Sequence, residues 1–283
     1  MMEKTVSLRR RGRRKNRTGR KLAILLVVAC LVLLLFLLAP WLCPYDPYAQ
    51  NLALAHMAPD PSHILGTDRY GRDLFSRVLM GGRTTVLAAF ALAASVTVVG
   101  TVIGVFSAWK GGKADAALMG MSDLFLAFPG LVFALAVAGV TGGGIQNAVL
   151  ALAAISWPKY RRLSRSLALQ LKGSSFIEAS RMAGTSTAVI IGRHMIPHMA
   201  GTLVVTAVLD LGTLMMEIAG LSFLGLGVKP PGAEWGAMIN ESRSFISLYP
   251  WMVFGPGAAI FLTVMIFNLL GDTLRDYLDP HGR

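Results

Sequence analysis

The feature that most constrains this chain is an uninterrupted apolar run from Leu22 to Leu42. As a helix its 21 residues would be about 31 Å long, enough to cross the hydrocarbon core of a bilayer. The rest of the chain has the same character, because 54% of its 283 residues are hydrophobic and only 15% are charged. A water-soluble core cannot hide so much apolar surface, so the composition predicts an all-α membrane protein.

Further apolar segments bring the predicted number of transmembrane helices to six. They are Thr84–Ala108, Ala117–Val140, Ile145–Trp157, His198–Gly220 and Trp251–Gly271. The fourth of the six is short, and we expect it to extend toward Leu163. The pattern divides the chain into a basic tail (1–21), a first helix with an extracytoplasmic segment (22–82), a five-helix core (83–272) containing a long connection (158–197), and a C-terminal tail (273–283).

The distribution of Lys and Arg predicts the orientation of these helices. Ten of the 27 lie within the first 21 residues, directly before the first apolar run. Over all connections, 21 fall on the side of the N-terminus and six on the other side. Because cytoplasmic loops are enriched in Lys and Arg, both termini are expected in the cytoplasm. The net charge of +12 is thus explained by a topogenic tail near anionic lipid, and no nucleic acid partner is expected.

Small residues and helix breakers occur inside the predicted spans. Gly100 and Gly104 are four residues apart, a spacing that lets another helix approach closely. Pro129–Gly130 and Pro256–Gly257 are expected to interrupt their helices at membrane depth. Each interruption alone is explained by simple kinking within a bundle, whereas together they favour a bundle that lines a pathway.

Catalytic and nucleotide-binding motifs are missing from the sequence. There is no G-x-x-x-x-G-K-[ST], H-E-x-x-H, G-x-S-x-G or C-x-x-C, and the five histidines are scattered. We therefore expect no catalytic residue, no cofactor and no metal site. An intramembrane enzyme would need a nucleophile–base or ligand cluster within the spans, which the pattern does not provide.

Three carboxylates do lie within the predicted spans, namely Asp123, Asp210 and Glu217. A charge near the centre of a transmembrane helix costs at least about 2.5–3.5 kcal/mol. Asp210 and Glu217 are seven residues apart, so they share one face of a helix. Two interpretations stay open: these groups line a watery translocation pathway, or they are protonated or paired in a structural role.

The connection 158–197 is the longest on the predicted cytoplasmic side. It contains two short helical segments with a turn expected at Gly184, and Pro197 is expected to end the second segment. Apolar residues such as Phe176, Ile177 and Met182 are too frequent for a solvated linker. A helix–turn–helix with an apolar face needs a groove on another protein to receive it.

This connection resembles the cytoplasmic EAA loop of binding-protein-dependent ABC importer permeases. The resemblance rests on Glu178-Ala179-Ser180, on Gly184 nine residues before Arg193-His194, and on Pro197. Other stretches resemble the dipeptide, oligopeptide and nickel branch of that family, and the similarity covers about residues 22 to 280. They are His63–Asp68 with Gly71-Arg72-Asp73, Leu221–Gly227 with Pro230-Pro231 and Trp235-Gly236, and Phe267–Pro280. Their plainer interpretation is as scaffold turns, with Asx-type hydrogen bonds at the two aspartates.

The resemblance implies a fold, a location and a set of partners. It implies the type I ABC importer permease fold in the bacterial inner membrane. It also implies a homologous second permease, two ABC ATPase subunits that hydrolyse the ATP, and an extracytoplasmic solute-binding protein. The residues that would couple the chain to the ATPase are Glu178, Ala179, Ser180, Gly184, His194 and Pro197.

The cargo is less constrained than the mechanism. Leu209–Gly212, Ile218–Leu221 and Ala233–Asn240 resemble nickel permeases more than dipeptide permeases. An intramembrane carboxylate suits a cationic solute or metal chelate, and equally the ammonium group of a peptide. We expect nickel or a nickel complex, with di- or oligopeptides as the alternative. A secondary transporter or channel is a more distant alternative, which corresponding broken helices in inverted repeats would indicate.

Overall fold

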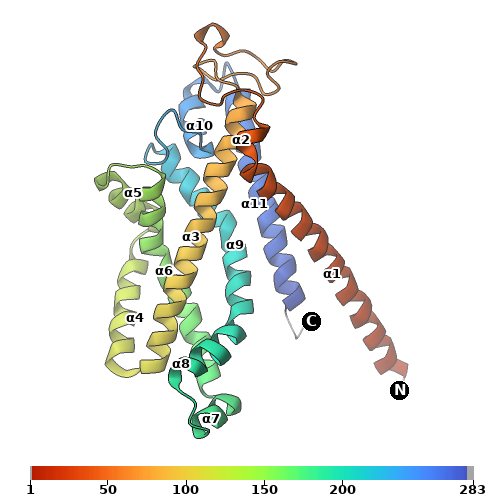
Figure 1. The fold of residues 1–283 in the computed structure, drawn as a ribbon, viewed down its shortest axis with the longest axis vertical. Coiled ribbons are helices and arrows are strands. Elements are labelled where there is room, and N and C mark those ends of the chain that lie inside the picture. Colours follow the sequence, from red (N-terminus) through yellow and green to blue (C-terminus); the bar gives the residue numbers. More distant parts are fainter. Residues whose placement is uncertain (1, 279–283) are drawn as a thin grey trace.

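The computed structural model describes residues 2–278, with side chains from residue 17 onward, and this part of the chain is helical without a β-strand (Figure 1). The side chains of residues 2–16 in the predicted basic tail, and residues 279–283 with Pro280, lie outside the description. The elements in chain order are α1 (Met2–Leu37), α2 (Ala39–Leu42), η1 (Leu52–Leu54), α3 (Leu74–Lys110), α4 (Gly112–Ala127), α5 (Gly130–Val140), α6 (Ile145–Lys172), α7 (Ser175–Met182), α8 (Thr187–Val189), η2 (Ile190–Met195), α9 (Ile196–Phe223), α10 (Trp235–Ser242), η3 (Arg243–Phe245) and α11 (Trp251–Leu278).

Four helices in the described residues are long and apolar enough to cross a membrane. They are Arg17–Leu37 within α1, α3, the continuous stretch Thr187–Phe223, and α11. α4 and α5 make a fifth if the bent pair counts as one span. The all-α membrane class is therefore confirmed. The number six stays a prediction, because α6 carries Lys and Arg throughout its second half.

The predicted span Ala117–Val140 is not one straight helix. α4 and α5 are bent by 89° at Phe128 and Pro129. Pro129 has no backbone N–H to donate, and it drives the preceding Phe128 into an extended conformation with φ −92° and ψ 143°. The interruption expected at Pro129–Gly130 is thus confirmed.

Two other prolines do not interrupt helices where the sequence predicts a break, and a third, Pro158, lies inside a helix that continues, as the expected extension toward Leu163 requires. α11 continues through Pro256, so the break expected at Pro256–Gly257 is wrong. α6 continues through Pro158 to Lys172, so residues 158–172 of the predicted connection are helix and the fourth span extends past Leu163. Pro197 does not end a helix either, because it lies in the first turn of α9, where a missing N–H costs little. The π-helical turn η2 leads into that position.

Two glycines bring α3 and α6 into close contact, as their spacing predicts. A Cβ on Gly100 would lie 2.4 Å from the Cβ of Tyr160, and one on Gly104 would lie 2.5 Å from the carbonyl oxygen of Arg161. Any larger residue at either position would force the two helices apart. This contact positions the cations of α6 against the rest of the bundle.

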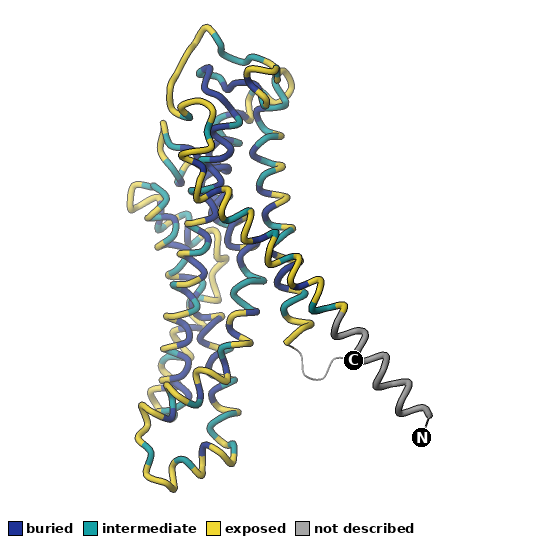
Figure 2. Tube along the Cα trace, turned by 45° about the vertical axis from the view of Figure 1, so that its right-hand side comes forward, coloured by how far each residue is buried: buried dark blue, intermediate teal, exposed yellow. Residues whose placement is uncertain are grey.

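The molecule has two distinct ends, which we call the α7 end and the α10 end (Figure 1). The α10 end carries the irregular segment 43–73 together with α10, whose Trp235 is fully buried. The indole Nε1 of Trp235 donates to the backbone oxygen of Val78 in α3 at 2.9 Å. α1 leans away from the bundle toward the α7 end, and many of its residues are exposed (Figure 2). Exposed apolar side chains on a long helix fit contact with lipid.

Candidate transport sites

One face of α7 is fixed to the beginning of α9. Ile177 is fully buried in an apolar cluster that includes Ile190, Met195 and Met199. The ring of Phe176 stacks on that of His198 with 5.0 Å between the centroids. α7 is therefore attached to the beginning of α9 through side-chain packing.

The opposite face of α7 is open. The side chain of Met182 is 89% exposed, and Gly184 ends the segment with φ +77°, which confirms the expected turn. Of the other residues predicted for coupling, Glu178, Ala179 and Pro197 are exposed, whereas Ser180 and His194 are partly buried. The Ser180 hydroxyl donates to the backbone oxygen of Phe176 at 2.8 Å. The structure thus gathers the predicted coupling residues around one protruding knob.

A second site is a cavity of about 220 Å³ between α6 and α9, which we call the α6–α9 cavity. Asp210 and Glu217 both line it, as their shared helix face predicts. Lys159 Nζ lies 2.6 Å from Asp210 Oδ1, and the Tyr160 hydroxyl donates to Asp210 Oδ2 at 2.9 Å. Glu217 forms no ion pair with any described residue. The rest of the lining is mostly aromatic and aliphatic and includes Phe125, Leu126, Phe128, Leu152, Ile155 and Leu214.

The third predicted pathway carboxylate lies elsewhere. Asp123 Oδ1 is 2.5 Å from Arg162 Nη2, both side chains are more than half exposed, and Asp123 does not line the α6–α9 cavity. Lys159 belongs to the cavity although the sequence assigned it to the connection. The expected extension of the fourth span toward Leu163 already includes Lys159 and was the available signal.

A buried ion cluster between α3, α4 and α6 was also missed. The Arg161 side chain is buried and donates to the Ser107 hydroxyl at 2.8 Å. Asp115 forms ion pairs with both Arg161 and Arg165. Cations inside an otherwise apolar helix were the available signal, because a buried charge requires a partner.

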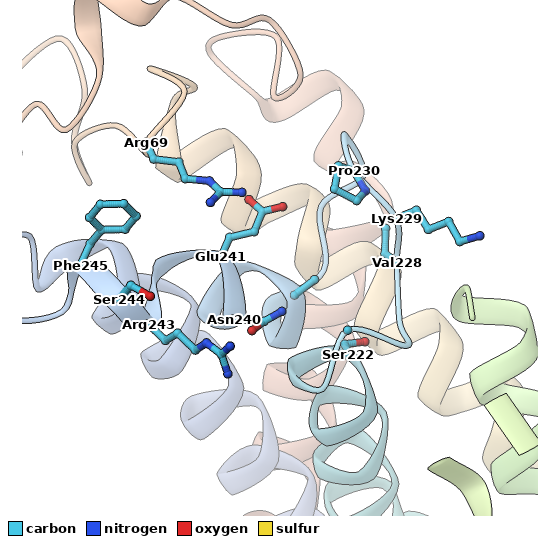
Figure 3. A pocket seen from close by; sticks show the side chains of 12 residues that line it. Arg69, Ser222, Val228, Lys229, Pro230, Asn240, Glu241, Arg243, Ser244 and Phe245 are labelled. Carbon is cyan, nitrogen blue, oxygen red and sulfur yellow. The ribbon is translucent and has the colours of Figure 1, made fainter. Parts of the chain in front are cut away.

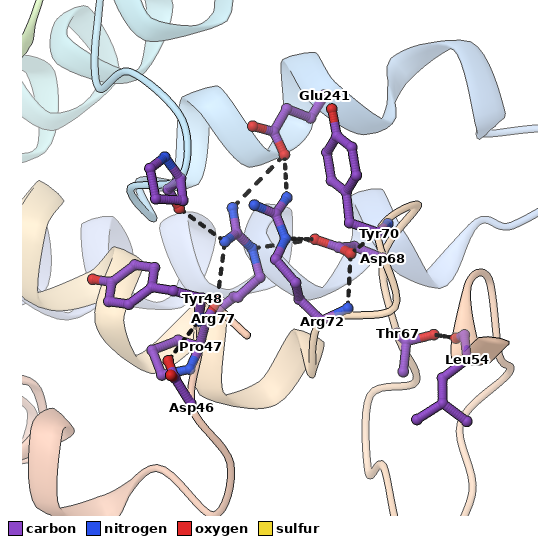
Figure 4. A network of polar contacts seen from close by, with 11 residues as sticks. Asp46, Pro47, Tyr48, Leu54, Thr67, Asp68, Tyr70, Arg72, Arg77 and Glu241 are labelled. Atoms are coloured by element: carbon purple, nitrogen blue, oxygen red, sulfur yellow. Dashed lines mark hydrogen bonds and ion pairs between the residues drawn. The ribbon is translucent and has the colours of Figure 1, made fainter. Parts of the chain in front are cut away.

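The α10 end holds a buried network that joins segments far apart in the sequence (Figure 4). Arg72 Nε donates to Asp68 at 2.6 Å, and its Nη2 donates to Glu241 at 2.8 Å. Arg77 Nε lies 3.4 Å from the same Asp68 carboxylate. Both arginine side chains are only 1% exposed. The network ties the irregular segment and the start of α3 to α10.

Local hydrogen bonds complete this arrangement. Arg77 Nη1 donates to the backbone oxygens of Pro47 at 3.1 Å and Pro231 at 3.2 Å. Asp68 Oδ1 accepts from the backbone N–H of Tyr70 at 2.8 Å, and Asp73 caps α3 by accepting from the Ser76 N–H at 2.8 Å. The Asx-type turns expected at the two aspartates are confirmed.

A larger cavity of about 450 Å³ lies beside this network, and we call it the α10-end cavity (Figure 3). It is bounded by the end of α9, the connection to α10, α10 itself and η3. Its lining residues are Arg69, Ser222, Gly225, Val228, Lys229, Pro230, Ala237, Asn240, Glu241, Arg243, Ser244 and Phe245. No local sequence pattern singles out this cavity, because its cations come from three separate segments, of which η3 carries Arg243.

No group of three or more His, Cys, Asp or Glu residues within the described chain is placed to hold a metal ion. The residues around α7 and the two cavities occupy different parts of the structure. They are connected by α9, which begins at α7, lines the α6–α9 cavity and ends at the α10-end cavity.

Comparison with known proteins identifies what this arrangement resembles. Residues 100–283 match the family model for the binding-protein-dependent transport system inner membrane component. Over 256 residues the chain is 41% identical to the nickel transport system permease protein NikC of Escherichia coli (strain K12), which covers 90% of this chain and 92% of that protein. It is 40% identical to the probable D,D-dipeptide transport system permease protein DdpC of the same strain, with 90% and 85% covered. A structure of the MetNI methionine ABC transporter in an inward-facing conformation shares the fold, with a TM-score of 0.60, 19% identity, and coverage of 72% of this chain and 97% of that chain.

Proposed function

Because this chain belongs to the family of binding-protein-dependent transport system inner membrane components, we propose that it forms half of the translocation path of an ATP-driven importer. It is a multi-pass inner-membrane protein and a permease subunit of an ABC importer. A homologous second permease supplies the other half of the path. Two ABC ATPase subunits hydrolyse the ATP at the cytoplasmic side, and an extracytoplasmic solute-binding protein delivers the cargo.

The observation that carries this proposal is the two-faced character of α7. Its inner face is locked to α9 through Ile177 and Phe176, while its outer face leaves Met182 exposed for a partner. ATP-driven closure of the ATPase subunits pushes on the open face. Because α9 carries Asp210 and Glu217, the push alters the α6–α9 cavity and alternates its access between the two sides of the membrane.

For the cargo we propose nickel or a nickel complex, with a di- or oligopeptide as the alternative. The relatives named for nickel and for D,D-dipeptides support the two options to the same degree. The α6–α9 cavity presents two carboxylates and one lysine, so it suits a solute with a positively charged group. A cationic chelate and a peptide ammonium both meet that requirement.

Reconstitution tests the function directly. The chain is co-expressed with the sister permease, ATPases and receptor of its system, placed in liposomes, and assayed for uptake of candidate solutes with and without ATP. We expect uptake that requires ATP and receptor. Uptake by the chain alone, driven by an ion gradient, would contradict the proposal and favour a secondary transporter.

A substitution at the turn of the coupling knob tests how force enters the permease. Gly184→Val places a β-branched residue at φ +77°, so the knob must change shape although nothing lies within 4 Å of the added Cβ. We expect normal insertion and ATP-driven uptake reduced by at least about tenfold. Gly173→Val is the matched control, since it adds the same side chain in open space at φ −90°. Equal uptake by the two variants would refute coupling through this knob.

A further inference from the structure

We infer that the α10-end cavity is a binding site for a carboxylate group of the transported solute. The inference rests on the proposed import function and adds a chemical requirement to it. The solute must bear a negative group as well as the positive group that suits the α6–α9 cavity. Free divalent metal ions do not meet this requirement.

The charges that line the cavity are unbalanced. Arg69, Lys229 and Arg243 contribute three cations, and none of them forms an ion pair with a described residue. Glu241 is the carboxylate of the lining, but its Oε2 is already bound by Arg72 at 2.8 Å. The cavity therefore repels a cation and attracts an anion.

The two guanidinium groups are held in place without carboxylate partners. Arg69 lies over the ring of Tyr70 with 4.5 Å to the centroid, and Arg243 lies over the ring of Phe223 at 5.8 Å. Stacking positions a guanidinium while leaving its N–H groups free to donate. Such groups are suited to paired hydrogen bonds with a planar carboxylate.

Unpartnered polar atoms lie in the same lining. The Nε of Arg69 and the Oγ of Ser222 are buried without a hydrogen-bond partner, and Ser222 is only 1% exposed. A buried donor without a partner is costly, so a ligand oxygen within reach of these groups would be stabilised. Figure 3 shows that these side chains come from different segments, with Arg69 before α3 and Ser222 at the end of α9.

The size and remaining surface of the cavity fit a small organic molecule. A volume of about 450 Å³ is within the usual range for small-molecule sites. Val228, Pro230 and Phe245 provide apolar surface next to the cations, and Asn240 and Ser244 add hydrogen-bonding groups. A peptide C-terminus and the carboxylate of an amino-acid chelator share this chemistry.

The test uses the complete importer in nanodiscs, without its receptor, and equilibrium dialysis of labelled solutes. The probes are D-alanyl-D-alanine, its C-terminal amide, the nickel bis-histidine complex, and free Ni²⁺. Arg243→Gln and Lys229→Gln remove exposed cations from the lining, so both variants should fold. Arg83→Gln is the matched control, because it removes a cation of α3 that does not line the cavity.

We expect at least one carboxylate-bearing probe to bind. Comparing the dipeptide with the nickel bis-histidine complex shows whether the bound carboxylate belongs to a peptide or to a metal chelate. Arg243→Gln should weaken that binding by about tenfold or more, and Arg83→Gln should leave it unchanged. Binding of the amide should be weak and equal in all variants. Equal binding of dipeptide and amide with no binding of the nickel complex would overturn the inference, as would tight binding of free Ni²⁺ that Arg243→Gln strengthens.

ATP-driven uptake by the same variants, placed in liposomes together with the receptor, separates this inference from the function on which it rests. Wild-type uptake that Arg243→Gln leaves intact overturns the carboxylate site alone. An assembly that binds solutes but shows no ATP-dependent uptake of any probe contradicts the proposed function.

Discussion

The carboxylates of the α10-end network and those of the α6–α9 cavity differ in how completely they are paired. Asp68 and Glu241 bind two arginines whose side chains are 1% exposed. Asp210 instead pairs with Lys159, whose side chain is 59% exposed. Glu217 lies nearby without an ion-pair partner among the described residues.

This difference in pairing suggests different roles for the α10-end network and for the Asp210–Lys159 pair. Removing one member of a buried ion network leaves its partners charged and desolvated, so such a network resists change. An exposed pair contributes little to stability and can exchange one partner for a solute. The α10-end network therefore holds its segments in one arrangement, while we propose that the α6–α9 pair responds to cargo.

The largest effect on folding should come from breaking the network. Arg77→Met removes a cation next to Asp68 and two backbone hydrogen bonds, and we expect a loss of about 3–5 kcal/mol in the free energy of unfolding. Thermal unfolding of the full chain in detergent, followed by tryptophan fluorescence, measures the loss. Arg83→Met is the control within α3. Equal stability of the two variants would show that the network is not the scaffold we describe.

A substitution at Asp210 should separate an effect on uptake from an effect on stability most clearly. Asp210→Asn should change the free energy of unfolding by less than about 1 kcal/mol, because the partner Lys159 is 59% exposed and an amide oxygen can still accept from the Tyr160 hydroxyl. ATP-driven uptake should fall by about tenfold, since the charge that faces the solute is lost. Asp123→Asn also removes an ion-paired carboxylate, but one outside the cavity, and should retain uptake. An equal loss of uptake in Asp210→Asn and Asp123→Asn would show that uptake does not depend on whether the carboxylate lines the α6–α9 cavity.

The smallest effect is expected at Glu217. Glu217→Gln keeps the shape of the side chain and removes a charge that no described residue pairs. Uptake of cationic solutes should fall by about two- to threefold, and stability should stay the same or rise slightly because a neutral amide costs less to bury. Uptake measured with solutes of different charge tests whether Glu217 acts on the charge of the solute. A loss that is independent of solute charge would assign Glu217 a structural role.

Local patterns in the sequence were sufficient to predict several of these features. Apolar run lengths predict membrane-spanning helices, and the spacing of Gly100 and Gly104 predicts a close helix contact. The seven-residue separation of Asp210 and Glu217 places both on one face of α9, where they line a single cavity. Each of these inferences needs only the geometry of one helix.

The remaining features depend on tertiary contacts. Glu241 lies 169 residues from Arg72, so no local pattern pairs them. Pro158, Pro197 and Pro256 are tolerated because of where each falls in its helix and what packs around it, whereas Pro129 produces an 89° bend. The α10-end cavity collects Arg69, Lys229 and Arg243 from two loops and η3, and only the folded chain brings them together.

The reach of α9 has a mechanical consequence. This helix runs from Ile196 to Phe223, which is 28 residues or about 42 Å. His198 touches the coupling knob near one end, Asp210 and Glu217 lie in the middle, and Ser222 lines the α10-end cavity at the other end. As a stiff lever, it would swing Ser222 through roughly 7 Å for a tilt of about ten degrees at the knob. One cycle of ATP-driven closure would then change the shape of the α10-end cavity and the α6–α9 cavity together. The displacement would be larger at the α10-end cavity, because it lies farther from the knob.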